Sequence, residues 1–128
     1  MSLLQWGNFT LHSGENSWWR IDCDAFTDSE IALIAKLMLE RIPNHYGKVL
    51  YPESHPGSVM HKLAAEMRNY IDEKSNNILI VDDVLTIGNS MRELYFLSAT
   101  YGAEIFGAVI FARGLCPSWV KPIFQMPS

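Results

Sequence analysis

The fold of this chain is decided by one stretch, Asn77-Ile78-Leu79-Ile80-Val81-Asp82-Asp83-Val84-Leu85-Thr86-Ile87-Gly88-Asn89-Ser90. Its first part, Ile78 to Val81, is short and wholly apolar, which predicts a strand covered on both faces, as in parallel sheets. Two carboxylates follow this strand, and a short loop with hydroxyl groups and a glycine leads into a helical pattern. Ligands of open parallel sheets bind beyond the carboxyl ends of the strands. The stretch therefore predicts a binding site at that edge.

The residue types in this stretch favour a sugar phosphate as the ligand. Ionised Asp82 and Asp83 would accept hydrogen bonds from vicinal hydroxyls and hold Mg²⁺ directly or through its waters. The start of a helix offers unpaired N–H groups and partial positive charge to a phosphate. We expect the phosphate contacts to come from Thr86, Ile87, Gly88, Asn89 and Ser90. The alternative is an ordinary strand-to-helix turn with solvated acids.

Composition narrows the class of protein. The 128 residues predict one domain, of which 48% are hydrophobic, and the net charge is −4. Because no run of Lys and Arg occurs, nucleic acid is not expected as a partner. No stretch has the length and apolarity of a membrane span, and the N-terminus lacks the pattern of a signal peptide. Cys23 and Cys116 lack metal-type spacing and are expected to be reduced thiols, which predicts a cytoplasmic protein.

Strands and helices alternate along most of the chain. We expect strands at 7–12, 17–22, 48–51, 77–82, 104–112 and 120–126, and helices at 28–42, 58–71 and 88–101. A capping box at Thr27 to Glu30 begins the first helix, Gly102 suits the C′ position of the last, and Pro122 predicts an edge strand. This alternation predicts an α/β fold with a parallel sheet flanked by helices. The first two strands stand apart and would form a small flap over the site.

Several motifs resemble a known family. The order strand, Asp-Asp, two apolar residues, Thr-x-Gly-x-Ser and helix resembles the phosphoribosyl-diphosphate signature of type I phosphoribosyltransferases. Receiver domains also carry paired acids after a strand, but no later strand here ends in Asp. The runs Phe9 to Gly14 and Ser17 to Asp22 are similar to the N-terminal segment of orotate phosphoribosyltransferases, which forms part of the base site and hood.

The resemblance implies a Rossmann-like fold of the type I class, with a hood at 1–26 and a core at 27–128 in a single domain. It implies a Mg²⁺-dependent, orotate-type phosphoribosyltransferase of nucleotide metabolism, a homodimer that acts on phosphoribosyl diphosphate and a nitrogen base. Asp82 and Asp83 would be the catalytic and metal-binding residues. The base site would be formed by Trp19, Arg20 and Arg113, and His12 and His55 are further candidates.

The sequence also departs from the family pattern. His12 stands where the family has a lysine, Ile87 replaces a hydroxyl residue, and Asn89 replaces a glycine. The region 51–58, where the family has a Gly-Gly loop for pyrophosphate, has one glycine and an added acid. No long loop with catalytic lysines fits into residues 52–77. Two alternatives therefore remain: a non-catalytic domain that binds a phosphoribosyl compound or nucleotide, and a degenerate subunit that works only in an oligomer.

Overall fold

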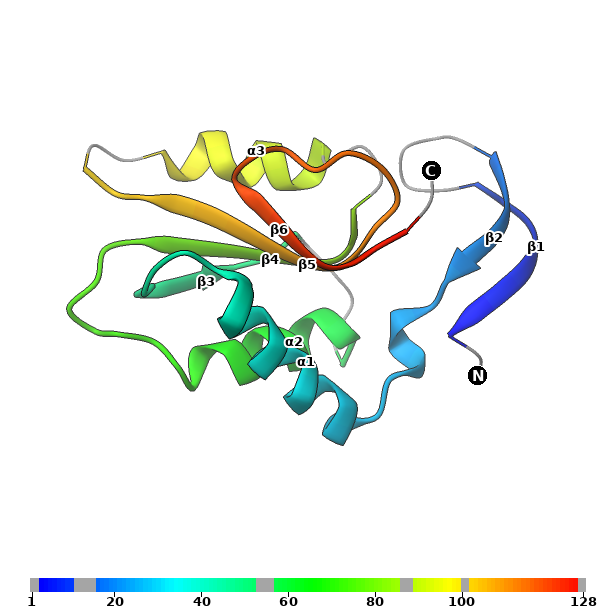
Figure 1. Ribbon diagram of the computed structural model, residues 1–128, viewed down its shortest axis with the longest axis horizontal. Helices are drawn as coiled ribbons and strands as arrows, with labels where there is room; N and C mark the ends of the chain where they lie inside the picture. Colours follow the sequence, from blue (N-terminus) through cyan, green and yellow to red (C-terminus); the bar gives the residue numbers. More distant parts are fainter. Residues whose placement is uncertain (1–2, 11–15, 53–56, 86–88, 100–101, 127–128) are drawn as a thin grey trace.

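The computed structural model describes residues 3–10, 16–52, 57–85, 89–99 and 102–126 (Figure 1). The elements in chain order are β1 (Leu4–Thr10), β2 (Asn16–Ile21), the short 3₁₀ helix η1 (Cys23–Ala25), α1 (Asp28–Arg41), β3 (Lys48–Leu50), α2 (Val59–Arg68), β4 (Ile78–Leu85), α3 (Asn89–Ser98), β5 (Ile105–Ala112) and β6 (Val120–Gln125).

Strands β3 to β6 form one parallel sheet in the order β3-β4-β5-β6. Helices α1 and α2 cover one face and α3 covers the other, so the core has three layers (Figure 1). The predicted α/β class with a parallel sheet is confirmed. Because β6 forms one edge of the sheet, Pro122 lies in an edge strand, as expected.

The two inner strands are apolar because both of their faces are covered. Leu79 and Val81 lie in the core beneath α1 and α2, whereas Ile78 and Ile80 belong to the core beneath α3. Side chains of a strand alternate between its faces, so a strand with helices on both sides must be hydrophobic at every position. This explains why the segment that precedes the acidic pair has no polar residue.

Some boundaries differ from the predictions. Strand β4 does not end at Asp82 but continues to Leu85, because β5 pairs with it as far as Leu85 opposite Ala112. The acidic pair is therefore part of the strand. Helix α2 ends at Arg68, three residues before the predicted end. Helix α3 ends at Ser98, so the prediction that Gly102 is its C′ residue is wrong, although Gly102 has a positive φ of 83°.

The start of α1 follows the prediction. The hydroxyl of Thr27 accepts the N–H of Glu30 at 3.2 Å, and the carboxylate of Glu30 accepts the N–H of Thr27 at 2.8 Å. This reciprocal pair satisfies two donors that the first turn leaves unpaired. Buried Ile31, Ile34 and Met38 then pack against the sheet.

Strands β1 and β2 form a separate antiparallel sheet beside the core, here called the hairpin (Figure 1). Most of β1 is exposed, and Trp6 is 74% exposed. A small N-terminal sheet outside the main sheet was predicted and is confirmed. Both cysteines are free thiols. Among the helices of the described ranges, none has the length and apolarity needed to cross a membrane.

Candidate functional site

The acidic pair lies on inner strand β4, near its carboxyl end. Asp82 pairs with Val109 of β5, and both carboxyl groups are partly buried. The backbone N–H of Asp83 donates to Asp82 Oδ1 at 2.8 Å, and that of Val84 donates to Asp83 Oδ1 at 2.7 Å. These bonds fix both carboxyl groups against their own strand, at the edge where a parallel sheet binds ligands.

The residues predicted to hold a phosphate follow directly. Helix α3 begins at Asn89, and Ser90 is exposed in its first turn. Thr86, Ile87, Gly88 and the side chain of Asn89 lie outside the described residues, as do His12 and His55. The structure therefore brings the acidic pair and the start of a helix together in the predicted order.

The charge of the acidic pair depends on its surroundings. Burial raises the pKa of Asp82 to about 8, and the neighbouring Asp83 carboxylate adds to this rise by repulsion and by a hydrogen bond. Without a bound cation, the protonated form of Asp82 is therefore favoured more strongly than in a solvated aspartate. A divalent cation would favour the doubly ionised form.

The two carboxyl groups of the acidic pair suit a Mg²⁺ ion that is also bound by the phosphates of a ligand. Mg²⁺ commonly takes one or two carboxylates together with waters and substrate phosphates. Two adjacent carboxyl groups match that requirement. Within the described ranges, no group of three or more His, Cys, Asp or Glu side chains is arranged to hold a metal by itself. Further ligands to the metal would have to come from water and from a bound phosphate.

Arg113 connects the end of β5 to the hairpin. Its guanidinium lies 3.7 Å from the centre of the Trp19 ring, and its Nη2 donates to Ser17 Oγ at 3.0 Å. The predicted pair of Trp19 and Arg113 is thus brought together. Arg20 instead stays within the hairpin, where its Nε donates to Gln5 Oε1 at 2.6 Å.

The sequence interpretation missed the part played by η1. Asp24 Oδ1 accepts the backbone N–H of Val59 at 2.9 Å, which ties η1 to the start of α2. Burial raises the pKa of the Cys23 thiol, which disfavours the reactive thiolate form. Negative charges near the thiol raise its pKa further, and these come from Asp83, Asp22, Asp24 and Asp82. No local pattern could reveal the contact of Asp24, because its partner lies 35 residues away.

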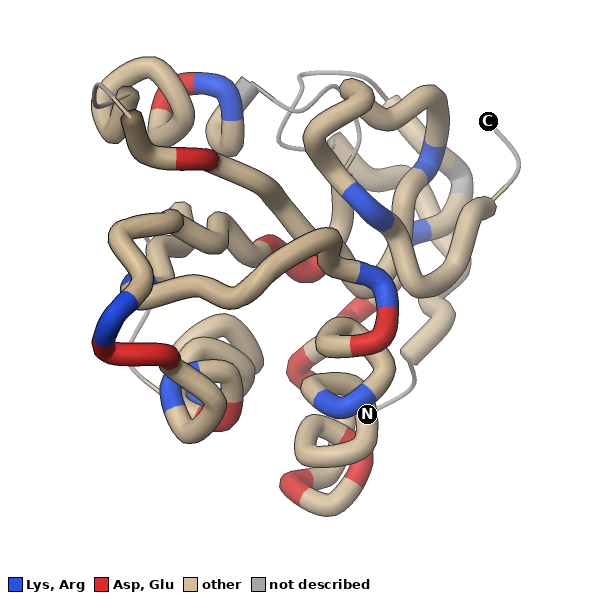
Figure 2. The backbone as a smooth tube through the Cα atoms, turned by 60° about the vertical axis from the view of Figure 1, so that its left-hand side comes forward, with Lys and Arg blue, Asp and Glu red and all other residues tan. Residues whose placement is uncertain are grey.

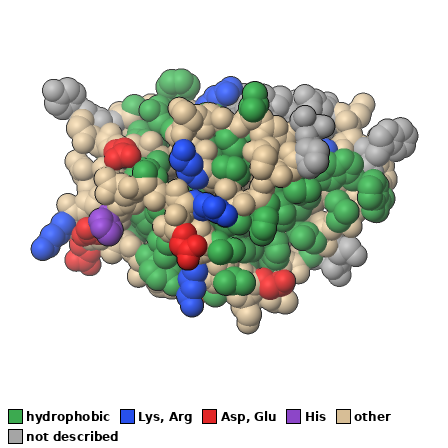
Figure 3. Space-filling view, in the orientation of Figure 1, with side chains coloured by type: hydrophobic (Ala, Val, Ile, Leu, Met, Phe, Trp, Pro, Cys, Tyr) green, Lys and Arg blue, Asp and Glu red, His purple; other side chains and the backbone are tan. Residues whose placement is uncertain are grey.

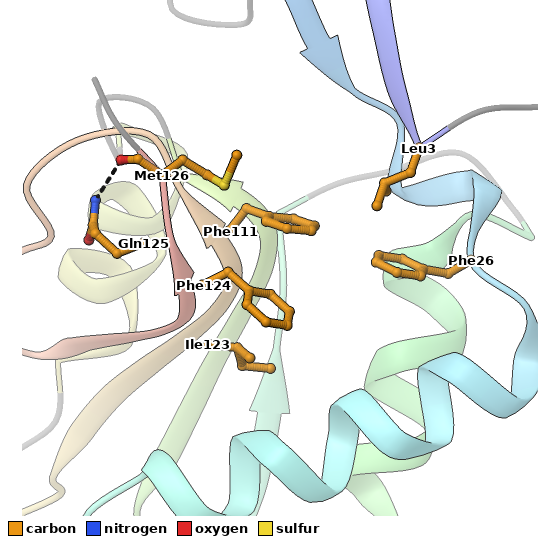
Figure 4. A pocket seen from close by; sticks show the side chains of 7 residues that line it. All are labelled: Leu3, Phe26, Phe111, Ile123, Phe124, Gln125 and Met126. Carbon is orange, nitrogen blue, oxygen red and sulfur yellow. Dashed lines mark hydrogen bonds between the residues drawn. The ribbon is translucent and has the colours of Figure 1, made fainter.

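An apolar cavity of about 500 Å³ opens between the hairpin side and the ends of β5 and β6 (Figure 4). Phe26 and Leu3 line one wall, and Phe111 and Phe124 line the other. The full lining consists of Leu3, Phe26, Phe111, Ile123, Phe124, Gln125 and Met126. Figure 3 shows hydrophobic side chains gathered toward the hairpin side of this view. The Phe111 ring stacks on Phe124 at 5.3 Å and faces Phe26 at 6.2 Å.

Charged residues are mixed over the rest of the described chain. Figure 2 shows positions of Lys and Arg interspersed with positions of Asp and Glu along several described elements. This arrangement agrees with the net charge of −4.

Comparison with solved structures identifies the fold. Orotate phosphoribosyltransferase from Aeropyrum pernix matches with a TM-score of 0.73 and 17% identity, over 97% of this chain and 88% of that chain. The fold is that of the type I phosphoribosyltransferases. Orotate phosphoribosyltransferase from Mycobacterium tuberculosis matches this phosphoribosyltransferase fold with a TM-score of 0.67 and 18% identity, over 96% and 89% of the two chains.

A purine enzyme of the same fold is also similar. Hypoxanthine phosphoribosyltransferase from Trypanosoma cruzi has a TM-score of 0.51 and 12% identity, over 80% of this chain and 75% of that chain. No family model and no curated protein sequence matches the chain. The phosphoribosyltransferase fold is thus established by structure, and the activity must be argued from the site itself.

Proposed function

We propose that this chain is a Mg²⁺-dependent, orotate-type phosphoribosyltransferase. The observation that carries the proposal is the position of Asp82 and Asp83, which lie at the carboxyl end of an inner strand, just before the start of α3, in a phosphoribosyltransferase fold. Two acids beside the start of a helix suit the diol and the 5′-phosphate of one ribose.

In the proposed reaction, the bond from C1 of the ribose to pyrophosphate breaks and a bond from C1 to a nitrogen of the base forms. By analogy with glycoside chemistry, the ribose passes through a cation-like state. Asp82 and Asp83 would bind the ribose hydroxyls and the waters of Mg²⁺, and residues 86–90 would bind the 5′-phosphate. Mg²⁺, when bound, would neutralise charge on the pyrophosphate as it leaves.

Arg113 and Trp19 are the residues we assign to the base. A guanidinium stacked on an indole presents a cation next to a flat apolar surface. This combination suits a planar base that carries an acidic group. Orotate is such a base, and the likeness to orotate enzymes supports it as the first substrate to test.

The test is release of pyrophosphate from phosphoribosyl diphosphate, Mg²⁺ and a panel of bases that includes orotate and hypoxanthine. We expect turnover with orotate and a loss of roughly 10²-fold or more in Asp83→Asn, because this change removes a charge at the reacting ribose. Arg92→Gln, on the outer side of α3, serves as a control and should retain the wild-type rate.

A second function is favoured by one specific observation. The start of α2, the other helix that begins at this edge, already accommodates the carboxylate of Asp24. A protein that binds a phosphoribosyl compound or nucleotide without catalysis needs no second anion site. Tight binding of ribose 5-phosphate or a nucleoside 5′-monophosphate, without turnover of phosphoribosyl diphosphate on any base, would support this alternative over the enzyme.

A further inference from the structure

The apolar cavity beside the hairpin is the feature from which this inference begins. Its volume of about 500 Å³ lies within the range of roughly 300–1,000 Å³ that is typical of small-molecule sites. Phe111 of β5 and Phe124 of β6 are partners in the register of the two parallel strands, and their rings stack at 5.3 Å. Phe124 is 45% exposed, and a ligand that covered its ring would remove apolar surface from water. The sheet thus presents an aromatic wall to an open space.

The opposite wall comes from the segments on either side of the hairpin. Phe26 follows η1, and its ring lies 6.2 Å from the ring of Phe111, with only 7° between the two planes. Leu3 precedes β1 and lies on the same side of the cavity as Phe26 (Figure 4). Aromatic rings bind flat ring systems through their faces and edges. The paired orientation of these rings therefore suits a flat, ring-bearing ligand.

Main-chain hydrogen bonds hold both walls in place. The carbonyl of Leu3 accepts the N–H of Asp22 at 2.6 Å, which ties the residue before β1 to the residue after β2. On the sheet side, the N–H of Met126 donates to the carbonyl of Ala112 at 2.7 Å. Walls that are already ordered lose little conformational freedom when a ligand binds. The cavity therefore has the construction of a preformed ligand site.

The chemistry of the lining limits the class of ligand. None of the described residues that line the cavity is charged, and the only polar side chain among them is Gln125. The Nε2 of Gln125 donates to the carbonyls of Gly114 at 2.8 Å and Met126 at 3.2 Å, and Figure 4 shows this side chain turned away from the rings. Burial of a charged group without a partner is costly. The lining thus disfavours sugar phosphates and other anions.

We propose that this cavity is a second ligand site, which binds a neutral, flat, ring-bearing compound. The rings of Phe26, Phe111 and Phe124 would contact the ligand on two sides, and Ile123 and Met126 would complete the apolar surface around it. None of the described residues assigned to the ribose, the phosphate or the base is among those that line the cavity. The inference therefore goes beyond the proposed function and does not depend on it.

Two fluorescent probes that share one ring system test the inference. N-phenyl-1-naphthylamine is neutral, and 1-anilinonaphthalene-8-sulfonate is the same molecule with a sulfonate group added. We expect saturable binding of the neutral probe, at least roughly tenfold tighter than binding of the anionic probe, because the lining offers no charge to pair with the sulfonate. Equal affinity for the two probes, or no saturable binding of the neutral probe, overturns the inference.

A matched pair of variants shows where the neutral probe binds. Phe124→Asn removes a ring from the sheet wall, and we expect it to bind this probe at least roughly tenfold more weakly. Phe96→Asn makes the same change on α3, where Phe96 is 74% exposed and does not line the cavity, and should retain the wild-type affinity. An equal loss in both variants, or no loss in Phe124→Asn, overturns the inference.

Methyl NMR of the wild-type chain gives a second measurement that needs no variant to fold. The methyl signals of Ile123 and Met126 should shift when the neutral probe binds, because both residues line the cavity. The signals of Ile80 and Met91, in the core beneath α3, should stay in place. Saturable binding without a shift at Ile123 or Met126 would place the probe elsewhere and overturn the inference.

Two further outcomes would assign the cavity to a different occupant. If orotate, or phosphoribosyl diphosphate with Mg²⁺, displaces the neutral probe, the cavity belongs to the site of the proposed function and is not a second site. If sedimentation shows a wild-type dimer that Phe124→Asn dissociates, the aromatic wall is a contact between two copies of the chain. Either result overturns the inference, whereas failure of the proposed function would leave it unaffected.

Discussion

The charge state of Asp82 is coupled to the stability of the protein. Burial raises its pKa to about 8 in the folded chain, and the charge of Asp83 contributes to this rise. In the unfolded chain, an aspartate titrates near its ordinary value of about 3.9. Between these two values the folded state holds more protons than the unfolded state. The free energy of unfolding therefore falls as the pH rises through this window.

We expect this fall to disappear in Asp82→Asn. From pH 5 to pH 8, in the absence of divalent cations, the wild type should lose on the order of 3 kcal/mol of stability that the variant retains. Urea unfolding at the two pH values measures the difference. Asp28→Asn should behave like the wild type, because Asp28 is highly exposed. An identical pH dependence in Asp82→Asn would show that Asp82 does not titrate in this range.

At the scale of the elements, the hairpin is the part with the weakest connection to the rest. A two-stranded sheet alone is marginally stable, and most of β1 is exposed. Arg113 contacts it through the stack on Trp19 and the hydrogen bond to Ser17. We expect this side chain to contribute to the free energy that holds β2 in place, together with the packing of Ile21 against the core.

Arg113→Lys tests this view of the hairpin. Lysine keeps the charge but loses the planar stack and the fork of donors. Loss of about 1.4 kcal/mol should make the amides of 16–21 exchange roughly tenfold faster, while the amides of β4 and β5 stay protected. Arg92→Lys on α3 is the matched control. Unchanged exchange in β2 would mean that other contacts hold the hairpin.

The elements differ in how far the sequence could predict them. The start of α1 was predictable because a capping box is local, and both its hydrogen bonds span three residues. The end of β4 was not, because its last residues join the strand by pairing with β5, about 27 positions later. The end of α3 was also missed, because the prediction placed Gly102 at the C′ position of this helix, whereas α3 ends at Ser98.

At the scale of the whole molecule, the candidate site also combines features with a local sequence signal and contacts between residues far apart in the sequence. The position of Asp82 and Asp83 between an inner strand and a helix was predictable, because these segments are continuous in sequence. The contacts from Asp24 to Val59 and from Arg113 to Ser17 join residues 35 and 96 positions apart. Such pairs follow from the way the layers pack, and a single sequence carries no local signal for them.

Ligand binding at the acidic pair should raise the free energy of unfolding of the whole domain. A ligand that binds only the folded state stabilises it by RT ln(1 + [L]/Kd), which is about 2.7 kcal/mol at a hundredfold excess over Kd. With phosphoribosyl diphosphate and Mg²⁺ together, we expect a rise of this size in the free energy of unfolding at pH 8. Because the cation favours the ionised acidic pair, removal of Mg²⁺ with a chelator should abolish most of the rise.

The variant Asp83→Asn decides whether this stabilisation arises at the acidic pair. It removes one of the two carboxylates, and we expect thermal and urea unfolding to respond little to ligand and Mg²⁺ in this variant. Asp72→Asn, whose carboxylate accepts the N–H of Lys74 in a distant turn, retains the pair and should respond like the wild type. If Asp83→Asn is stabilised by the ligand as much as the wild type is, the ligand binds elsewhere. A ligand stabilises the folded chain only through the residues that it contacts.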